Sequence, residues 1–288
     1  EDFKLKGGVL EPEKELEAVR AIKEVDAKLR VGGPSTSACK WLPEFLTYCE
    51  QNDLPCDFVS THHYPGDAFG NFINFSNVRH MFTAATDAAK TGKTLSETMT
   101  NMFYLPDDCR RWDKGTLARM DREAKRKAGD RPLFITEWNS MAVFGSPVHD
   151  EKYSAAFAVK SCLDLDGSAD AYMFWCCSDL FEEQFMLPKP FVGSFGIVSN
   201  DGIPKPNFWG FKLLSKLYPN RLSLPDTGDV DAGAFTDGKN VQLLLTPQSG
   251  DPTGNECHDT KITLDFPAAD VTIERIDETH CNPKAEWI

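Results

Sequence analysis

The sequence predicts an α/β protein whose parallel sheet is packed against helices and is followed by a small all-β domain. Short apolar runs alternate with helical patterns over residues 1–219, and the pattern changes to a period of two over residues 220–288. A chain of 288 residues, 41% of them hydrophobic, can bury a sizeable core as one large domain or as one domain plus a small one. The alternation is compatible with an open doubly wound sheet and with a (β/α)8 barrel.

The first predicted elements precede a long polar and aromatic segment that runs from Tyr64 to about Asp113. A helix begins with Pro12 in its first turn, and its apolar residues then recur at helical spacing. After it we expect a strand in the run LRVGG (29–33), a helix in 40–50 and a strand in 56–63.

The alternation resumes beyond that segment. Two strands are predicted, LFITE and the aromatic-rich AYMFWCC, and helices are predicted before, between and after them. In chain order these are a charged helix near 114–128, the strand 133–137, a helix near 152–163, the strand 171–177 and a helix at 207–218.

The last part of the chain reads as strands and turns. Residues 233–246 predict a hairpin with an Asp237-Gly238 turn. The runs KITLDF (261–266) and VTIERI (271–276) alternate with period two and add two predicted strands. We therefore expect residues 220–288 to form a small antiparallel β-sandwich.

Charge and hydropathy exclude several kinds of partner. A formal net charge of −13 disfavours nucleic acid, whose phosphates are bound by clustered Lys and Arg. No apolar run approaches the roughly 20 residues that span a bilayer, and the first residues, EDFKLKGG, do not have the pattern of a signal peptide. We expect a soluble protein without a membrane partner, and the sequence leaves the compartment open.

Polar and aromatic residues follow the predicted strands at their carboxyl ends. In a barrel enzyme this is the face that carries the chemistry, and a sugar needs hydrogen-bond partners for its hydroxyls and aromatic surfaces for its ring. The residues concerned are Ser35, Thr36, His62, His63, Glu137, Trp138, Asn139, Ser178 and Asp179.

Neither a metal nor a cofactor is expected. His62 and His63 have no third ligand at metal-like spacing. Gly32 and Gly33 are followed by Pro34 and Ser35, so the glycine pattern of a dinucleotide-binding fold is incomplete.

The residues of the strand ends also carry a family resemblance. The blocks LRVGGPSTS, CDFVSTHHYP, PLFITEWNS, SPVHDEKYSAAFAVKSC, AYMFWCCSDLFEEQ, FVGSFGIVSNDGIPKPNFWGFKLLSKL and RIDETHCNPKAEW resemble, in this order, glycoside hydrolase family 39. That family holds β-xylosidases and α-L-iduronidases. The resemblance implies a (β/α)8 barrel with a β-sandwich, of which this chain carries only about strands five to eight, and a retaining hydrolysis that uses two glutamates.

One of the two glutamates is found by the resemblance and the other is not. Glu137, at the end of what resembles barrel strand seven, matches the nucleophile. The acid/base glutamate of the family lies in an Asn-Glu-Pro motif, whereas the one upstream Glu-Pro here, Glu11-Pro12, has the features of a helix start. We therefore expect residues 1–219 to be the carboxyl-terminal half of a catalytic barrel.

Further residues are implied as sugar contacts. His62 matches a histidine that lines the sugar site, whereas His63 should point to the opposite face of its strand. Glu182 and Glu183 match a glutamate pair that holds sugar hydroxyls in the xylosidases, and on their own they would be a solvated acidic loop.

Aromatic residues and one amide complete the predicted site. Trp138 and Asn139 adjoin the nucleophile, and the alternative for Trp138 is ordinary core packing. Trp175 faces either the sugar or the helices, and Phe191 belongs to a segment that resembles the loop after strand eight.

The substrate prediction is a β-xyloside, hydrolysed by an exo-acting enzyme. The pair Glu182 and Glu183 favours xylose because two carboxylates repel a uronic acid. The closing run 275–287 looks closer to the iduronidases, so an iduronidase or another pentosidase is the alternative. A sugar-binding remnant without catalysis is the alternative of another class. The expected partners are the saccharide, and either the missing half of the barrel or a second copy of the chain.

Overall fold

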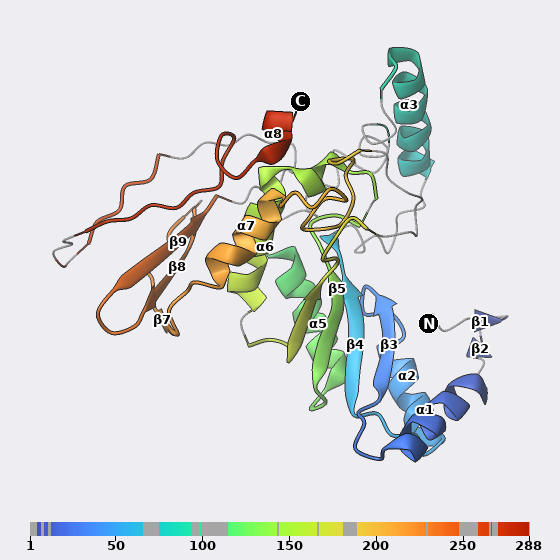
Figure 1. Ribbon diagram of the computed structural model, residues 1–288. Helices are drawn as coiled ribbons and strands as arrows, with labels where there is room; N and C mark the ends of the chain where they lie inside the picture. The colour runs from blue at the N-terminus through green and yellow to red at the C-terminus, as the bar shows by residue number, and fades with distance from the viewer. Residues whose placement is uncertain are drawn as a thin grey trace.

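The described residues form a four-stranded parallel sheet, a three-stranded antiparallel sheet and helices, most of which pack against these two sheets (Figure 1). A short hairpin, β1 (Leu5–Lys6) and β2 (Val9–Leu10), precedes them. The computed structural model describes residues 5–6, 9–10, 13–65, 75–93, 98, 115–142, 144–165, 167–180, 189–228, 230–247, 259–264, 266 and 270–287.

The parallel sheet has four strands in chain order, each paired with the next. Helices connect the strands, as the alternation in the sequence predicts. The strands are β3 (Gly32–Ser37), β4 (Phe58–His63), β5 (Leu133–Trp138) and β6 (Ala171–Phe174), and the helices are α1 (Glu13–Val25), α2 (Leu42–Gln51), α3 (Phe75–Thr91), α5 (Thr116–Ala128), α6 (Lys152–Leu165) and α7 (Pro206–Leu214).

The main core lies between one face of this sheet and the helices. Val59, Leu133 and Ile135 are almost completely buried and pack with apolar residues of α2, α5 and α6. The opposite face is less covered, because Met173, which points away from the core side of β6, is 47% exposed. The sheet therefore has one face buried by helices and an opposite face that is only partly covered among the described residues.

The boundaries of two strands differ from those that the sequence predicts. β3 starts at Gly32 rather than at residue 29, because Gly32 is the first residue to pair with β4 and residues 26–29 still belong to the turn after α1. β6 ends at Phe174 rather than at residue 177, because Cys176 turns away from β5 and exchanges backbone hydrogen bonds with Phe195 and Ile197.

α3 was not predicted, since it lies in the segment that was identified only as polar and aromatic. Its residues 75–91 form a helix that stands beside the sheet, away from the core (Figure 1). Phe82 of this helix is 71% exposed. Val78, Met81, Phe82, Ala85 and Ala89 recur at helical spacing, so the helical signal is present in the sequence although the segment as a whole is polar and aromatic.

The predicted hairpin forms as expected and belongs to a three-stranded antiparallel sheet of β7 (Asn220–Leu222), β8 (Asp231–Thr236) and β9 (Val241–Thr246). At its turn Asp237 accepts hydrogen bonds from two following backbone N–H groups, and Gly238 has φ 93°. Phe235 and Leu244 pack on α6. This sheet lies on the far side of α6 and α7 from the parallel sheet (Figure 1).

The two last predicted strands are wrong for the residues that the structure describes. Residues 261–264 and 271–276 pair with no neighbouring strand there and expose Ile262, Val271 and Ile273. A period of two predicts which side chains share a face, but a strand also needs a hydrogen-bonding partner. The described part of residues 220–288 thus contains one sheet, followed by the short helix α8 (Pro283–Trp287).

No helix in the described ranges combines the length and apolar character needed to cross a membrane.

Candidate active site

The carboxylate of Glu137 is directed by an irregularity in β5. Thr61 pairs with Ile135 and His62 pairs with Glu137, so β5 has one more residue than β4 at this point, Thr136. In a regular strand Glu137 would share the face of Ile135, which is buried against the helices. The bulge instead directs Glu137 to the other face and leaves Trp138 on the core side.

Glu137 lies beside two groups of the neighbouring strand β4 and the residues after it. The Tyr64 hydroxyl donates a hydrogen bond of 2.9 Å to Glu137 Oε2. His62 Nδ1 lies 3.4 Å from the same oxygen. The side chains of Glu137 and His62 are 23% and 22% exposed, so a ligand can reach both of them.

His63 is turned away from this site, as the alternation of the strand predicts. It is 1% exposed, and Cys39 Sγ lies 3.2 Å from its Nε2. Burial, with a smaller effect of His62, lowers the pKa of His63 to about 3, and burial raises the pKa of Cys39 to about 11. A buried neutral thiol and imidazole do not form a nucleophilic pair, so these two residues belong to the core.

The sequence leaves open whether Trp138 forms a sugar platform or packs in the core. Its side chain is 2% exposed and packs edge-on against Phe174 and Phe211, with ring centroids 5.0 and 6.1 Å away. This packing favours the alternative of a core residue over a substrate contact for Trp138. The bulge that exposes Glu137 is what buries the next residue.

Asn139 is completely buried, so its predicted place in the site is one beside the nucleophile rather than at the surface. Its Nδ2 donates to the carbonyl oxygens of Trp175 and Phe195, the latter at 3.1 Å, and its Oδ1 accepts from the backbone N–H of Ser140 at 2.6 Å. Asn139 thus ties the end of β5 to the end of β6. Trp175, half-buried at the end of β6, donates its backbone N–H to Trp138 O at 3.0 Å.

The remaining predicted sugar contacts are Phe191, Glu182 and Glu183. Phe191 has φ 58° and packs against Trp287 of α8, with ring centroids 6.3 Å apart. Glu182 and Glu183 lie outside the described residues. Their role as sugar contacts stays a prediction.

Tyr64, which the sequence pattern did not single out, adjoins Glu137, and Phe195 of the segment that resembles the loop after strand eight lies next to Tyr64. Tyr64 was visible only as the last letter but one of the quoted CDFVSTHHYP block. Phe195 is buried, and its ring centroid lies 6.4 Å from that of Tyr64. The sequence signal was the position of Tyr64 two residues after His62, which returns a side chain to the same face of an extended chain.

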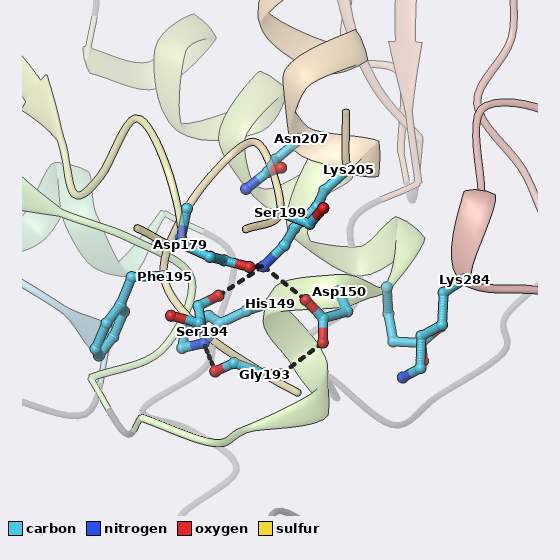
Figure 2. Close-up of polar contacts among 12 residues, drawn as sticks. His149, Asp150, Asp179, Gly193, Ser194, Phe195, Ser199, Lys205, Asn207 and Lys284 are labelled. Atoms are coloured by element: carbon cyan, nitrogen blue, oxygen red, sulfur yellow. Dashed lines mark hydrogen bonds and ion pairs between the residues drawn. The ribbon is translucent and has the colours of Figure 1, made fainter. Parts of the chain in front are cut away.

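Behind Phe195 lies a buried cluster of charges (Figure 2). The Lys205 ammonium lies 2.7 Å from Asp150 Oδ1 and 2.7 Å from Asp179 Oδ2, and all three side chains are 0 to 1% exposed. Burial raises the pKa of Asp179, and the ammonium of Lys205 opposes this effect. We call Lys205, Asp150 and Asp179 the buried charge cluster. The sequence predicts Asp179 among the polar residues at the strand ends and gives no signal for the other two.

His149 joins the same region. Its Nδ1 lies 2.8 Å from Gly193 O and its Nε2 lies 3.0 Å from Met141 O, so the ring links two loops. It belongs to the short helix η3 (Pro147–Asp150), which precedes α6. Burial lowers the pKa of this completely buried histidine.

The chain belongs to glycosyl hydrolases family 39. The model of that family matches residues 14–115 and 109–288, which together cover nearly all of the chain.

Relatives and solved structures agree with this membership. The chain is 32% identical over 277 residues to a β-xylosidase of Caldicellulosiruptor saccharolyticus, covering 94% of this chain and 51% of that protein. It is 30% identical over 272 residues to a β-xylosidase of Geobacillus stearothermophilus, covering 93% and 49%. A crystal structure of a monomeric β-xylosidase from Caulobacter crescentus CB15 is similar with a TM-score of 0.60 at 28% identity, covering 84% and 45%. The chain thus spans about half the length of the curated relatives it matches.

Proposed function

We propose that this chain is part of a retaining glycoside hydrolase in which Glu137 is the nucleophile. The single observation that carries the proposal is the carboxylate at the carboxyl end of β5, brought to an accessible face by a bulge and held by the Tyr64 hydroxyl at 2.9 Å. The family supports the class of reaction. A carboxylate that is fixed and partly exposed can attack an anomeric carbon.

The mechanism requires a second carboxyl group. In the first step Glu137 attacks the anomeric carbon through an oxocarbenium-like transition state and forms a glycosyl ester, while an acid protonates the leaving oxygen. In the second step that acid, now a base, activates water, which releases the sugar with retained configuration. The two carboxyl groups must lie roughly 5 to 5.5 Å apart. We place the second one in a part of the protein outside these 288 residues.

We propose that residues 1–219 are half of a (β/α)8 barrel. Support comes from four consecutive parallel strands with connecting helices on one face, and from an opposite face that leaves Met173 47% exposed. In a closed barrel that opposite face is the filled interior. Residues 220–288 would then form an accessory β domain.

The proposed substrate is a β-xyloside. The two curated relatives are named β-xylosidases, and His62 beside Glu137 offers a polar contact to a sugar hydroxyl. The iduronidase alternative rests on residues 275–287, of which Trp287 contacts Phe191. A sugar-binding remnant is the outcome if no covalent intermediate forms.

The test is covalent trapping by an activated 2-fluoro-xyloside, which forms the glycosyl ester and turns it over slowly. We expect the mass of the active protein to rise by one sugar and peptide mapping to place that sugar on Glu137. Glu137→Gln should show no increase, because an amide is not nucleophilic. The matched control is Glu44→Gln, an exposed glutamate of α2, which should be labelled like the parent protein.

Labelling of Glu137→Gln at the parent rate would show that another residue is the nucleophile. Trapping by a 2-fluoro-iduronide in preference to the xyloside would instead favour the iduronidase alternative.

A further inference from the structure

Lys205 is a charged residue whose side chain is completely buried (Figure 2). Its ammonium group lies between Asp150 and Asp179 and also donates to Ser194 O at 2.9 Å. Burying an ion costs several kcal/mol, and such clusters are often no more stabilising than apolar side chains of the same volume. A contribution to stability therefore does not explain why these three charged residues are present. The backbone segment that they hold suggests another role.

The two aspartates hold one short segment of backbone, residues 193–196. Gly193 N donates to Asp150 Oδ2 at 2.6 Å, and Gly196 N donates to Asp179 Oδ1 at 2.7 Å. Hydrogen bonds to ionised acceptors are about twice as strong as neutral ones. Both ends of the segment are thus fixed by charged groups, one from η3 and one from the residues after β6.

The segment is also packed too closely for any side chain at its ends. A Cβ on Gly193, whose φ is 78°, would lie 2.5 Å from Ser146 O. A Cβ on Gly196 would lie 2.4 Å from the backbone N of Asp179. The backbone of residues 193–196 is therefore confined by contacts as well as by hydrogen bonds.

Phe195 connects this segment to the nucleophile in two ways. Its ring lies 6.4 Å from that of Tyr64, whose hydroxyl donates to Glu137. Its carbonyl oxygen accepts from Asn139 Nδ2 at 3.1 Å, and Asn139 is two residues beyond Glu137. A displacement of residues 193–196 would therefore shift both the Tyr64 ring and the Asn139 side chain, which lie on either side of Glu137.

We propose that the buried charge cluster positions the nucleophile: Lys205, Asp150 and Asp179 fix residues 193–196, and Phe195 then fixes Tyr64 and Asn139 around Glu137. The inference rests on the proposed role of Glu137. None of the three charged residues touches substrate, so they are positioning residues. Displacing a reacting group by about 1 Å can cost about 100-fold in rate.

The decisive variant replaces the whole cluster by apolar residues of similar size, Lys205→Met with Asp150→Leu and Asp179→Leu. It leaves no unpaired buried charge, so the protein is expected to fold. We would measure trapping by the activated 2-fluoro-xyloside in the active protein and separate the saturating rate constant from the binding constant. We expect the rate constant per folded molecule to fall about 10- to 100-fold, with the binding constant changed less than about 3-fold.

A second lysine of the chain supplies a matched control. Lys160 bridges Asp164 and Asp231, the latter at 3.5 Å, and its side chain is 12% exposed, but it joins α6 to β8. Lys160→Met with Asp164→Leu and Asp231→Leu removes a similar cluster remote from Glu137. We expect it to change the thermal unfolding temperature and to leave the trapping rate constant as in the parent.

The outcomes separate this inference from the proposed function. A parent protein that is not labelled contradicts the role of Glu137 itself. A labelled parent together with a folded cluster variant that is labelled equally fast overturns the positioning role. If the cluster variant does not fold, Phe195→Leu decides: slower trapping supports the inference, and the parent rate overturns it.

Discussion

The direction of Glu137 depends on one extra residue, Thr136, in β5. The carboxylate follows an apolar run whose regular alternation would bury it against the helices, where an ionised group is costly. With the bulge it reaches the Tyr64 hydroxyl and His62 instead, and Trp138 takes the buried position. The same local irregularity therefore decides the roles of two adjacent residues.

His63 should give the protein a distinct dependence of stability on pH. Its folded pKa is about 3 because of burial, while an unfolded histidine has a pKa of about 6.5. Below pH 6.5 the unfolded chain binds a proton that the folded protein does not, so the free energy of unfolding falls by about 1.4 kcal/mol per pH unit. The stability that folding gains by keeping His63 neutral is therefore fully present above pH 6.5 and is lost as the pH falls toward 3.

Urea unfolding at pH 7 and pH 5 measures this effect. We expect the parent to lose about 2 kcal/mol more between these values than His63→Leu does. The control is Val59→Ala, a buried apolar residue of the same strand β4, which should lower the free energy of unfolding at both pH values and keep the parent dependence on pH. Equal losses in the parent and in His63→Leu would mean that folding does not lower the pKa of His63.

At the scale of elements, the ends of β5 and β6 are joined by side chains that also build the core. Trp138 of β5 packs on Phe174 of β6 and on Phe211 of α7. Asn139 donates to the carbonyl of Trp175. The candidate site is thus built at strand ends, where packing fixes the rotamers of the neighbouring side chains. Fixing side chains in this way is a common means of holding a catalytic group in place.

Trp138→Leu tests the structural role of this indole. We expect the free energy of unfolding to fall by about 2 to 4 kcal/mol, because a large buried ring leaves a cavity. Since the ring is buried in the core, we expect the binding constant for the trapping reagent to stay within about 3-fold. Trp209→Leu, a partly exposed tryptophan of α7, is the control and should cost less stability. A large loss of binding in Trp138→Leu would restore the sugar-platform interpretation.

At the scale of the whole molecule, the parallel sheet has a face that is only partly covered among the described residues. Tyr172 and Phe174 of β6 pack against the helices, and Met173 between them is 47% exposed. An exposed face of this kind usually marks a surface that another part of a protein covers. The proposed first half of the barrel is the natural cover.

Methionine oxidation by hydrogen peroxide tests that proposal. In the isolated 288-residue chain Met173 should be oxidised readily, and in the complete enzyme it should be protected at least about 10-fold, because barrel interiors are packed. Met141 is 1% exposed and should stay protected in both, which shows that the chain is folded. Equal oxidation of Met173 in both samples would contradict the half-barrel proposal.

The sequence by itself determined the elements with strong local signals and the carboxylate at the end of β5. The alternation of strands and helices, the hairpin at Asp237-Gly238 and the opposite faces of His62 and His63 follow from periodicity and turn chemistry, which are local properties.

The tertiary structure decided what depends on a partner distant in sequence. The strands begin and end at other residues than predicted, because a strand extends only as far as it pairs with a neighbouring strand. Residues 261–264 and 271–276 have no such neighbouring strand among the described residues. The burial of Trp138 and Asn139 follows from a bulge, which is defined only by the neighbouring strand. The contact of Lys205 with Asp150 and Asp179 brings together residues up to 55 positions apart, a distance that no local pattern reports.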